Sequence, residues 1–579
     1  MSVRQGGGRE LWRSHCRGRQ RRRSASGPGA GRQFLLAQTL LWPQAGHGSS
    51  RYRANVLSAK FRPAVVLVAL GLLVACTTTT AGNGSGADRV TPPSRPTASA
   101  SGSQSAAPLE FNDCSRLLDL GRVSADRRKK LTVECARIQV PLDYARPTGP
   151  EISVGLLRIH YADQPQRIGS LLVNPGGPGA SGISLAVVLA GELSTDVLEH
   201  FDIVGFDPRG VGLSAPVKCL STAQEDQLLA LDTDVRTTAG LRAAKQLYAG
   251  FATSCNARYG AAIGHYDTVD TARDMDRIRA ALGDATMNYL GFSYGTELGA
   301  IYAHLFPKTI RVAALDGAID PKWDDLVSLY GAQVAGFEQA FDQFAADCVT
   351  HDPCRELGDP RQAVYAIRDR AATSPIPSSD AHDKRRATAS LVLLGVLQAL
   401  YSRDLWLDLG HALLAARLGD AKGLLALADD YAERDGSGQY SNSLDVYFTV
   451  TCNDEAADPD DATIQAKGRA WATQYPMFGL WQAATLAQCS GWQKQRTPIP
   501  PETATSSAPI LVVGNLHDPA TPYAGAVNLT KELGRASLLS WNGEGHTSYL
   551  EGSRCVDRAV NAYLINKTLP TPNTTCPAR

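Results

Sequence analysis

Basic charge is scarce in most of this 579-residue chain, although the formal net charge of the whole is +1. Residues 1–62 hold thirteen Lys and Arg against a single acid, Glu10, so the remaining residues carry a net negative charge. A protein that binds nucleic acid needs a basic face toward the phosphates. The composition therefore argues against nucleic acid as a partner of the main part of the chain.

The apolar run from Pro63 to Ala75 has thirteen residues and no charge, which is too short for a lasting transmembrane helix of about 20 residues. Basic residues flank it on the N-terminal side, as in a secretory signal: Arg51, Arg53, Lys60 and Arg62. The sequence Leu73-Val74-Ala75-Cys76 resembles the lipobox of bacterial lipoproteins. By that resemblance Cys76 becomes the lipidated N-terminus after cleavage. An ordinary signal with a chance cysteine is the alternative.

Metal-binding motifs are lacking, since the sequence contains no CxxC and no HExxH. We expect no metal and no organic cofactor. Of twelve cysteines, ten remain once Cys16 and Cys76 are set aside, and an even number in an exported chain favours disulfides. The sequence does not give their connectivity. The simplest arrangement joins neighbours: Cys114–Cys135, Cys219–Cys255, Cys348–Cys354, Cys452–Cys489 and Cys555–Cys576.

Composition divides the chain into five parts. Residues 1–75 form an N-terminal extension with the lipoprotein signal. Residues 76–110 are mostly Thr, Ser, Gly, Pro and Ala, which predicts a disordered tether between an anchor and a folded body. Residues 111–321 and 506–579 carry strand-like patterns, whereas residues 322–505 are mainly helical. We therefore expect a core in two segments, with a helical cap inserted between them.

From residue 152 short apolar runs alternate with helical patterns, which predicts a doubly wound, mainly parallel sheet. The expected strands are Ile152–Ile159, Ser170–Asn174, Asp202–Phe206, Met287–Leu290, Val312–Leu315, Pro509–Val513 and Ala536–Ser540. The clearest helical pattern is the leucine-rich segment from Ala389 to Tyr431. Catalytic loops of such a sheet gather at the carboxyl ends of its strands.

Gly291-Phe292-Ser293-Tyr294-Gly295 follows one predicted strand and precedes a helical pattern. This is GxSxG in the strand–turn–helix setting that a nucleophile elbow requires. The serine lies on a strained turn, and the flanking glycines avoid clashes with its close neighbours. The helix that begins there directs backbone N–H groups toward developing negative charge. GxSxG also occurs by chance, but this setting favours Ser293 as a nucleophile.

A second glycine-rich turn, NPGGPG at residues 174–179, follows another apolar strand. Because glycine lets the backbone approach a reacting carbonyl, the N–H groups of Gly177 and Tyr294 are the predicted oxyanion hole. The same turn also fits the GxGxxG of a dinucleotide fold over residues 177–182. Pro178 within the turn counts against that alternative, and so does the serine motif, which a dinucleotide fold leaves unexplained.

Two polar loops follow the last two predicted strands, NLHDP at residues 515–519 and GEGH at residues 543–546. The order Ser, Asp, His along the chain is that of α/β hydrolases. Both loops leave strand ends, so both can converge on Ser293. Asp518 is therefore the predicted acid, and His546 the predicted base.

Two other carboxylates compete for the role of the acid. Asp316 and Asp320 follow an earlier strand, and some α/β hydrolases carry the acid after the sixth strand of the sheet. We favour Asp518, because it lies in the last loop before the histidine strand. The expected architecture is thus an α/β-hydrolase fold with a large helical cap inserted between strands 6 and 7.

Six motifs occur in order along the chain: NPGGPG, FDPRGVGLS, DTVDTARDMDRIRAALG, GFSYGT, GNLHDPATP and GEGH. Together they resemble the tripeptidyl aminopeptidase family, the exported actinobacterial branch of the prolyl-aminopeptidase-like α/β hydrolases, which includes mycobacterial cell-envelope serine proteases. The resemblance covers roughly residues 110–579. It implies cleavage of short peptides from a free N-terminus, with the cap limiting access. It carries over the triad and the oxyanion hole: Ser293, Asp518, His546, Gly177 and Tyr294.

Thr451-Cys452-Asn453-Asp454-Glu455 lies late in the predicted cap. An exopeptidase must bind the ammonium group of its substrate, and carboxylates on the cap would do so while blocking longer chains. Asp454 and Glu455 are the candidates. A solvated acidic loop beside a disulfide is the alternative interpretation.

The sequence as a whole predicts a serine peptidase that is anchored to a membrane through Cys76, or secreted. Its predicted partners are peptides with a free N-terminus, which it cleaves through an acyl-enzyme on Ser293. A carboxylesterase or lipase acting on cell-envelope esters is the alternative, because the triad does not distinguish an amide from an ester. A non-catalytic, lipid-anchored binding protein is disfavoured, since both the serine and the histidine are present.

Overall fold

A computed structural model describes residues 109–121, 123–352, 354–455, 457–492 and 499–579. The predicted signal run, Cys76 and the tether up to residue 108 lie outside these ranges. Across the described ranges, no helix combines the length and the apolar character needed to cross a bilayer.

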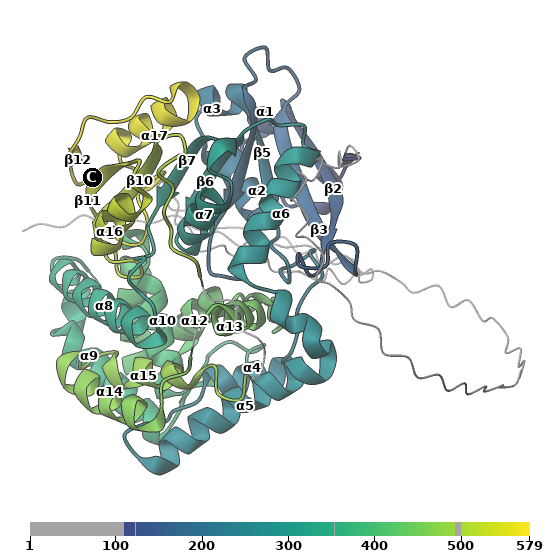
Figure 1. Ribbon diagram of the computed structural model, residues 1–579. Coiled ribbons are helices and arrows are strands. Elements are labelled where there is room, and N and C mark those ends of the chain that lie inside the picture. The colour runs from purple at the N-terminus through teal and green to yellow at the C-terminus, as the bar shows by residue number, and fades with distance from the viewer. Residues whose placement is uncertain (1–108, 122, 353, 456, 493–498) are drawn as a thin grey trace, which may run out of the picture. The chain divides into compact units, whose positions relative to one another are not determined.

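One ten-stranded sheet organises the described part of the core, in the order β1-β2-β3-β5-β4-β6-β7-β10-β11-β12 (Figure 1). The strands are β1 (Asn112–Asp113), β2 (Leu131–Pro141), β3 (Glu151–Tyr161), β4 (Gly169–Asn174), β5 (Phe201–Phe206), β6 (Met287–Phe292), β7 (Ile310–Asp316), β10 (Ile510–His517), β11 (Ala536–Glu544) and β12 (Thr575–Cys576). The pairings from β1 to β5 are antiparallel, and those from β5 to β12 are parallel. The predicted mainly parallel sheet is confirmed.

Helices cover both faces of the parallel part of the sheet, so every residue of β4, β5 and β6 is buried. Leu171 and Val173 of β4 pack on one face with α2, α3 and α17, whereas Leu172 packs on the other with α6, α7 and α16. The helices of the core are α1 (Ala125–Arg128), α2 (Gly182–Glu192), α3 (Thr195–His200), α6 (Thr268–Ala281), α7 (Tyr294–Leu305), α16 (Ala524–Leu533) and α17 (Arg554–Asn566). Because β4, β6, β10 and β11 are parallel, their carboxyl ends lie at the same end of the sheet.

Between β7 and β10 the chain forms a mainly helical layer, called the cap below (Figure 1). Its α-helices are α8 (Leu326–Cys348), α9 (Pro360–Thr373), α10 (Ala389–Leu400), α11 (Trp406–Arg417), α12 (Lys422–Ala432), α13 (Ser443–Asp454), α14 (Asp461–Gln474) and α15 (Gly479–Ala483), with a two-stranded ribbon of β8 (Ile376–Pro377) and β9 (Arg386–Ala387). Short 3₁₀ helices occur in the core segment at η1 (Ser115–Leu117), η2 (Gly260–His265) and η3 (Pro307–Thr309), and in the cap at η4 (Cys354–Leu357), η5 (Arg403–Leu405) and η6 (Ala484–Ala487). Counted from β2, the cap follows the sixth strand of the sheet and precedes the seventh.

The structure adds two features to those expected from the sequence. Strand β2 has no counterpart among the predicted strands, because one side of it is partly exposed and its apolar run is broken by polar residues. Helices α4 (Thr222–Leu229) and α5 (Thr238–Tyr259) come from the first core segment but pack against the cap, where Phe251 stacks on Trp492 with ring centroids 5.9 Å apart. The cap is therefore assembled with helices from two separate parts of the chain.

Five disulfides join the ten cysteines of the described chain, and they are the five neighbour pairs of the simplest arrangement. Cys219–Cys255 ties the segment after β5 to α5, and Cys452–Cys489 ties α13 to the segment after η6. Because a disulfide restricts the unfolded chain, each of these bonds stabilises the arrangement of the helices that it joins.

Candidate active site

Ser293 lies on a sharp turn between β6 and α7, with φ 55° and ψ −129°. The turn leaves no room for side chains on either flank. A Cβ on Gly291 would be 2.3 Å from the carbonyl oxygen of Gly295, and one on Gly295 would be 2.8 Å from that of Asn174. The backbone N–H of Ser293 donates to the carbonyl of Asp316 on β7, at 3.0 Å. Close packing and this hydrogen bond hold the serine in its strained conformation.

The glycine-rich turn after β4 packs directly against Ser293. A Cβ on Gly176 would be 2.9 Å from Cβ of Ser293 and 2.8 Å from the backbone nitrogen of Tyr294. Gly177 follows with φ +111°, a conformation that favours glycine. The backbone N–H groups of Gly177 and Tyr294 donate to no other described residue. Two such donors beside a serine hydroxyl can stabilise an oxyanion.

The same glycines do not form a dinucleotide site. A Cβ on Gly179 would be 2.3 Å from the carbonyl oxygen of Ser443 in the cap, so main chain already covers the turn. Gly182 starts α2 in close contact with β5, where a Cβ would be 2.1 Å from the carbonyl oxygen of Phe206. The last two glycines of the motif therefore contact main chain, so a pyrophosphate cannot lie against them.

His546 and Asp518 are brought together by the loops after β11 and β10. Nδ1 of His546 lies 2.8 Å from Oδ1 and 3.0 Å from Oδ2 of Asp518, whose side chain is fully buried. The carboxylate also accepts hydrogen bonds from the backbone N–H groups of Ala520, Thr521 and Thr547. With Nδ1 donating to the carboxylate, Nε2 is left as the acceptor.

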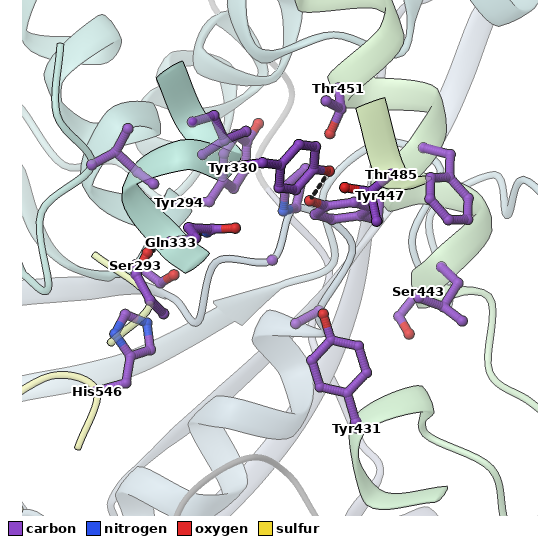
Figure 2. Close-up of a pocket in the computed structure, with 18 of the residues that line it drawn as sticks. Ser293, Tyr294, Tyr330, Gln333, Tyr431, Ser443, Tyr447, Thr451, Thr485 and His546 are labelled. Carbon is purple, nitrogen blue, oxygen red and sulfur yellow. Dashed lines mark hydrogen bonds between the residues drawn. The ribbon is translucent and has the colours of Figure 1, made fainter. Parts of the chain in front are cut away.

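Nε2 of His546 is buried and forms no hydrogen bond with any described residue, Ser293 included. Ser293 and His546 nevertheless face one another at one end of the cavity (Figure 2). In unliganded hydrolases this hydrogen bond is often long and tightens when substrate binds. The arrangement can transfer a proton from the serine to the imidazole once a substrate excludes water.

Neither of the two competing carboxylates is hydrogen-bonded to His546. Oδ2 of Asp316 accepts from the N–H groups of Ser548 and Tyr549, at 3.0 and 2.7 Å. Burial, together with the nearby charge of Asp518, raises the pKa of Asp316 to about 7. Asp320 accepts from Asn528 at 2.8 Å, on the side of the loop toward α16. Of the three carboxylates that the sequence offers, the structure places Asp518 alone on the histidine.

Ser293 and His546 open into a cavity of about 840 Å³ between the core and the cap. Aromatic side chains form much of its wall. The hydroxyls of Tyr330 and Tyr447 lie 2.8 Å apart (Figure 2). The hydroxyl of Tyr330 also donates to Gln488 at 2.7 Å. Such a wall suits an extended organic substrate held by packing and a few hydrogen bonds.

Asp454 and Glu455 both line this cavity, at the end of α13 and immediately after it. Asp454 accepts hydrogen bonds from Thr268, at 3.1 Å from its N–H and 2.7 Å from its hydroxyl. Burial, and after it the charge of Asp267, raises the pKa of Asp454 well above its usual range. The two residues therefore belong to a partly buried wall of the cavity and not to a solvated loop.

Two further acids of this wall were not predicted from the sequence. Burial raises the pKa of Glu297 to about 7. Burial and the charge of Glu297 raise the pKa of Glu502, which is 3% exposed and whose Oε2 has no hydrogen-bond partner in the described chain. Glu297 lies one helical turn after Ser293, a spacing that signals the same face of α7. No sequence motif marks Glu502, which only long-range folding brings here.

Across the described residues, no group of three or more His, Cys, Asp or Glu side chains is arranged to hold a metal ion. The geometry is that of a serine hydrolase: a serine on a strained elbow, a histidine held by a buried carboxylate, and two backbone N–H groups beside the serine. The class of the protein is thus an α/β-hydrolase serine hydrolase.

Comparison with known proteins places the chain more closely. Residues 475–576 match the family described as TAP-like protein. The serine protease Hip1 of Mycobacterium tuberculosis is 38% identical over 76% of this chain and 87% of its own length. Carboxylesterase B of the same species is 36% identical over 78% and 88%. The tripeptidyl aminopeptidase of Streptomyces lividans is 31% identical over 81% and 86%. The chain belongs to the tripeptidyl aminopeptidase-like family of serine hydrolases.

Proposed function

We propose that Ser293, His546 and Asp518 form the catalytic triad. Oγ of Ser293 attacks the scissile carbonyl while Nε2 of His546 takes the hydroxyl proton. The N–H groups of Gly177 and Tyr294 stabilise the oxyanion. The tetrahedral intermediate then collapses, and the leaving amine departs with the proton from His546. Water hydrolyses the acyl-enzyme by the same route, which restores Ser293.

The proposed substrate is a short peptide with a free N-terminus, from which the enzyme releases a tripeptide-like unit. The charge of the cavity carries this proposal. Ten of the residues that line it are Asp or Glu, and none of the described lining residues is Lys or Arg. An acidic, partly dehydrated wall favours a cation and disfavours a carboxylate or phosphate ester. Asp454 and Glu455 are the proposed ligands of the substrate ammonium, supported by Glu297 and Glu502.

Hydrolysis of a neutral ester is the second candidate function. One relative is named carboxylesterase B, and the aromatic wall of the cavity would accommodate an acyl chain as well as a peptide. The triad chemistry is the same for both substrates. The two functions therefore differ only in whether the acidic wall helps to bind the substrate. An ester without an amine gains nothing from it.

The test compares a tripeptide amide with its N-acetylated form, alongside a short acyl ester. Acetylation removes a charge-assisted contact and leaves the acidic wall without the substrate's positive charge, a loss of about 2–4 kcal/mol or roughly 30- to 1000-fold in kcat/KM. This preference should shrink sharply in Asp454→Asn/Glu455→Gln and persist in Asp408→Asn/Asp461→Asn, which removes two exposed carboxylates of the cap. Equal cleavage of free and acetylated peptides by the wild type would instead favour the esterase or an endopeptidase.

We also propose that the protein is exported and anchored to a membrane by a lipid on Cys76, or else secreted. The five disulfides support an oxidising compartment, because such bonds rarely persist in a reducing cytosol. The signal-like run and Cys76 lie outside the described residues, so the anchor rests on the sequence alone.

A further inference from the structure

Besides the turn that carries Ser293 and Tyr294, three core loops carry proposed catalytic groups, and the cap touches each of these three. We call these the oxyanion loop (residues 174–182), the acid loop (residues 515–521) and the histidine loop (residues 543–549). At each loop one of the contacts lies at a glycine, where the main chain of one element lies directly on that of the other. Such contacts leave little freedom for one element to slide against the other.

The acid loop lies against the middle of α8. A Cβ on Gly336 of α8 would be 2.3 Å from the carbonyl oxygen of Pro519, the residue after Asp518. One turn earlier on the helix, Nε2 of Gln333 donates to the carbonyl of Ala520 at 3.2 Å. Helix α8 therefore holds the two residues that follow the proposed acid.

The histidine loop lies against the end of α10. The N–H of His546 donates to the carbonyl of Tyr401 at 2.8 Å, and Ser402 forms an isolated antiparallel bridge with Gly545. A Cβ on Gly545 would be 2.7 Å from that same Tyr401 carbonyl. The Tyr401 ring also meets the imidazole edge-on, with centroids 5.5 Å apart.

The oxyanion loop lies against the start of α13. A Cβ on Gly179 would be 2.3 Å from the carbonyl oxygen of Ser443 and 3.2 Å from the backbone nitrogen of Tyr447. Gly179 is two residues after Gly177, a proposed oxyanion donor. The cap thus supports the acid, the base and the oxyanion hole from three of its helices.

We propose that the cap is a positioning element of the catalytic apparatus and not a lid that lifts away from it. The inference rests on the triad proposed above. The hydrogen bond between His546 and Asp518 lies between two cap contacts, so a shift of α8 or of the end of α10 misaligns it. Because α8 also contributes Tyr330, Gln333 and Phe337 to the cavity wall, substrate binds against the helix that holds the acid loop.

Gly336→Ala is the most direct test, since Gly336 is buried, helical and outside the cavity lining. The added methyl must move α8 and the acid loop apart by about 1 Å to reach an ordinary contact, and a misplacement of that size can cost about 100-fold in rate. Gly250→Ala on α5 is the matched control, because it also replaces a helical glycine and its Cβ would meet nothing within 4 Å.

We expect Gly336→Ala to lower kcat about 10- to 100-fold, while Gly250→Ala stays near wild type. The rate of fluorophosphonate labelling of Ser293 should fall in parallel with kcat. The downfield NMR resonance of the proton between His546 and Asp518 should shift or broaden in Gly336→Ala but not in Gly250→Ala. A variant that is only less stable, but still folded, would keep this resonance unchanged.

Folded Gly336→Ala with wild-type kcat and labelling rate would overturn the inference alone. A wild type that the fluorophosphonate does not label on Ser293 would overturn the proposed triad, and the inference with it. Should Gly336→Ala fail to fold, Gln333→Met decides, because it removes the bond to Ala520 at nearly constant volume. A fall in kcat with the same NMR change would support the inference, and an unchanged resonance would overturn it.

Discussion

The backbone of Ser293 has a conformation that non-glycine residues rarely adopt and that costs about 1–3 kcal/mol. The surrounding glycines and the hydrogen bond to the carbonyl of Asp316 hold it in place. This conformation places the Ser293 hydroxyl at one end of the cavity, where it faces His546 (Figure 2). Two backbone N–H donors lie beside it. Strain of this kind at one residue is a common mark of a reacting group.

Replacing Ser293 tests that role. Ser293→Ala should lower kcat by at least about 10³-fold, because it deletes the covalent route, and should leave KM nearly unchanged. Steady-state kinetics with a tripeptide amide checks this, and a fluorophosphonate should label the wild type at Ser293 only. Labelling of another residue, or a rate that survives the substitution, would remove Ser293 from the mechanism.

The two buried aspartates near the histidine should behave differently. Asp518→Asn should cost about 10³- to 10⁴-fold in kcat by misorienting His546. Asp316→Asn keeps an oxygen that can accept from Ser548 and Tyr549, so its cost should be far smaller. The assignment of the acid would be wrong if Asp316→Asn were the more damaging of the two.

Sequence motifs predicted which strand-end residues the structure brings together, because each motif reflects local backbone geometry. GxSxG, NPGGPG and the two late loops each lie at a strand end, and parallel strands bring such ends together. Glu297 and Glu502 were missed for a different reason. The raised pKa values of Glu297 and Glu502 depend on burial in the cavity wall. That burial results from the packing of α7, α13 and the segment before β10, which no local sequence pattern predicts.

At the scale of elements, helix α7 links the proposed nucleophile to the acidic wall. The helix starts immediately after Ser293 and turns Glu297 toward the cavity one turn later. Helix α13 delivers Asp454 from the cap to the same place, where burial keeps the pKa of both carboxyl groups high. Peptide binding should therefore depend on pH, because the carboxyl groups of Glu297 and Asp454 change charge at pH values above the usual carboxyl range.

The preference for free over N-acetylated tripeptide should be lost as the pH falls. Glu297 has a pKa of about 7, so below that pH it becomes neutral and no longer attracts an ammonium group. Above about pH 8 the substrate amine loses its own proton, and the preference falls again. The ratio of kcat/KM for the two peptides, measured across pH, cancels any pH dependence that the two substrates share. A flat ratio would contradict the account, and Glu297→Gln should leave only the acidic limb that Asp454 produces.

Elements with strong patterns were predictable, and those defined by long-range packing were not. The buried strands β4, β5 and β6 read as apolar runs because helices cover both faces of the sheet. The segment from Ala389 to Tyr431 is helical as expected, but it divides into α10, α11 and α12. Gly419, at φ +104°, separates the last two. The association of α4 and α5 with the cap has no sequence signal.

At the scale of the whole molecule, the cavity lies between the core and the cap, which meet in close contacts at glycines. The sequence before the described residues adds the proposed anchor. Cys76→Ser should release the protein from the membrane fraction into the medium, because a single thiol carries the lipid. Cell fractionation measures this, and mass spectrometry of the mature wild type should find a lipidated N-terminal cysteine. An intact peptide spanning residues 75–77 in the mature protein would contradict the anchor.

The central claim is that Ser293 forms an acyl-enzyme with the N-terminal unit of a peptide whose ammonium group sits in the acidic wall. Rapid acid quenching during turnover of a free tripeptide nitrophenyl ester, followed by peptide mapping, tests it most directly. The account predicts a tripeptidyl adduct on Ser293, and much slower formation of the adduct from the N-acetylated ester. An adduct on another residue, or equal rates of acylation by the two esters, would contradict it.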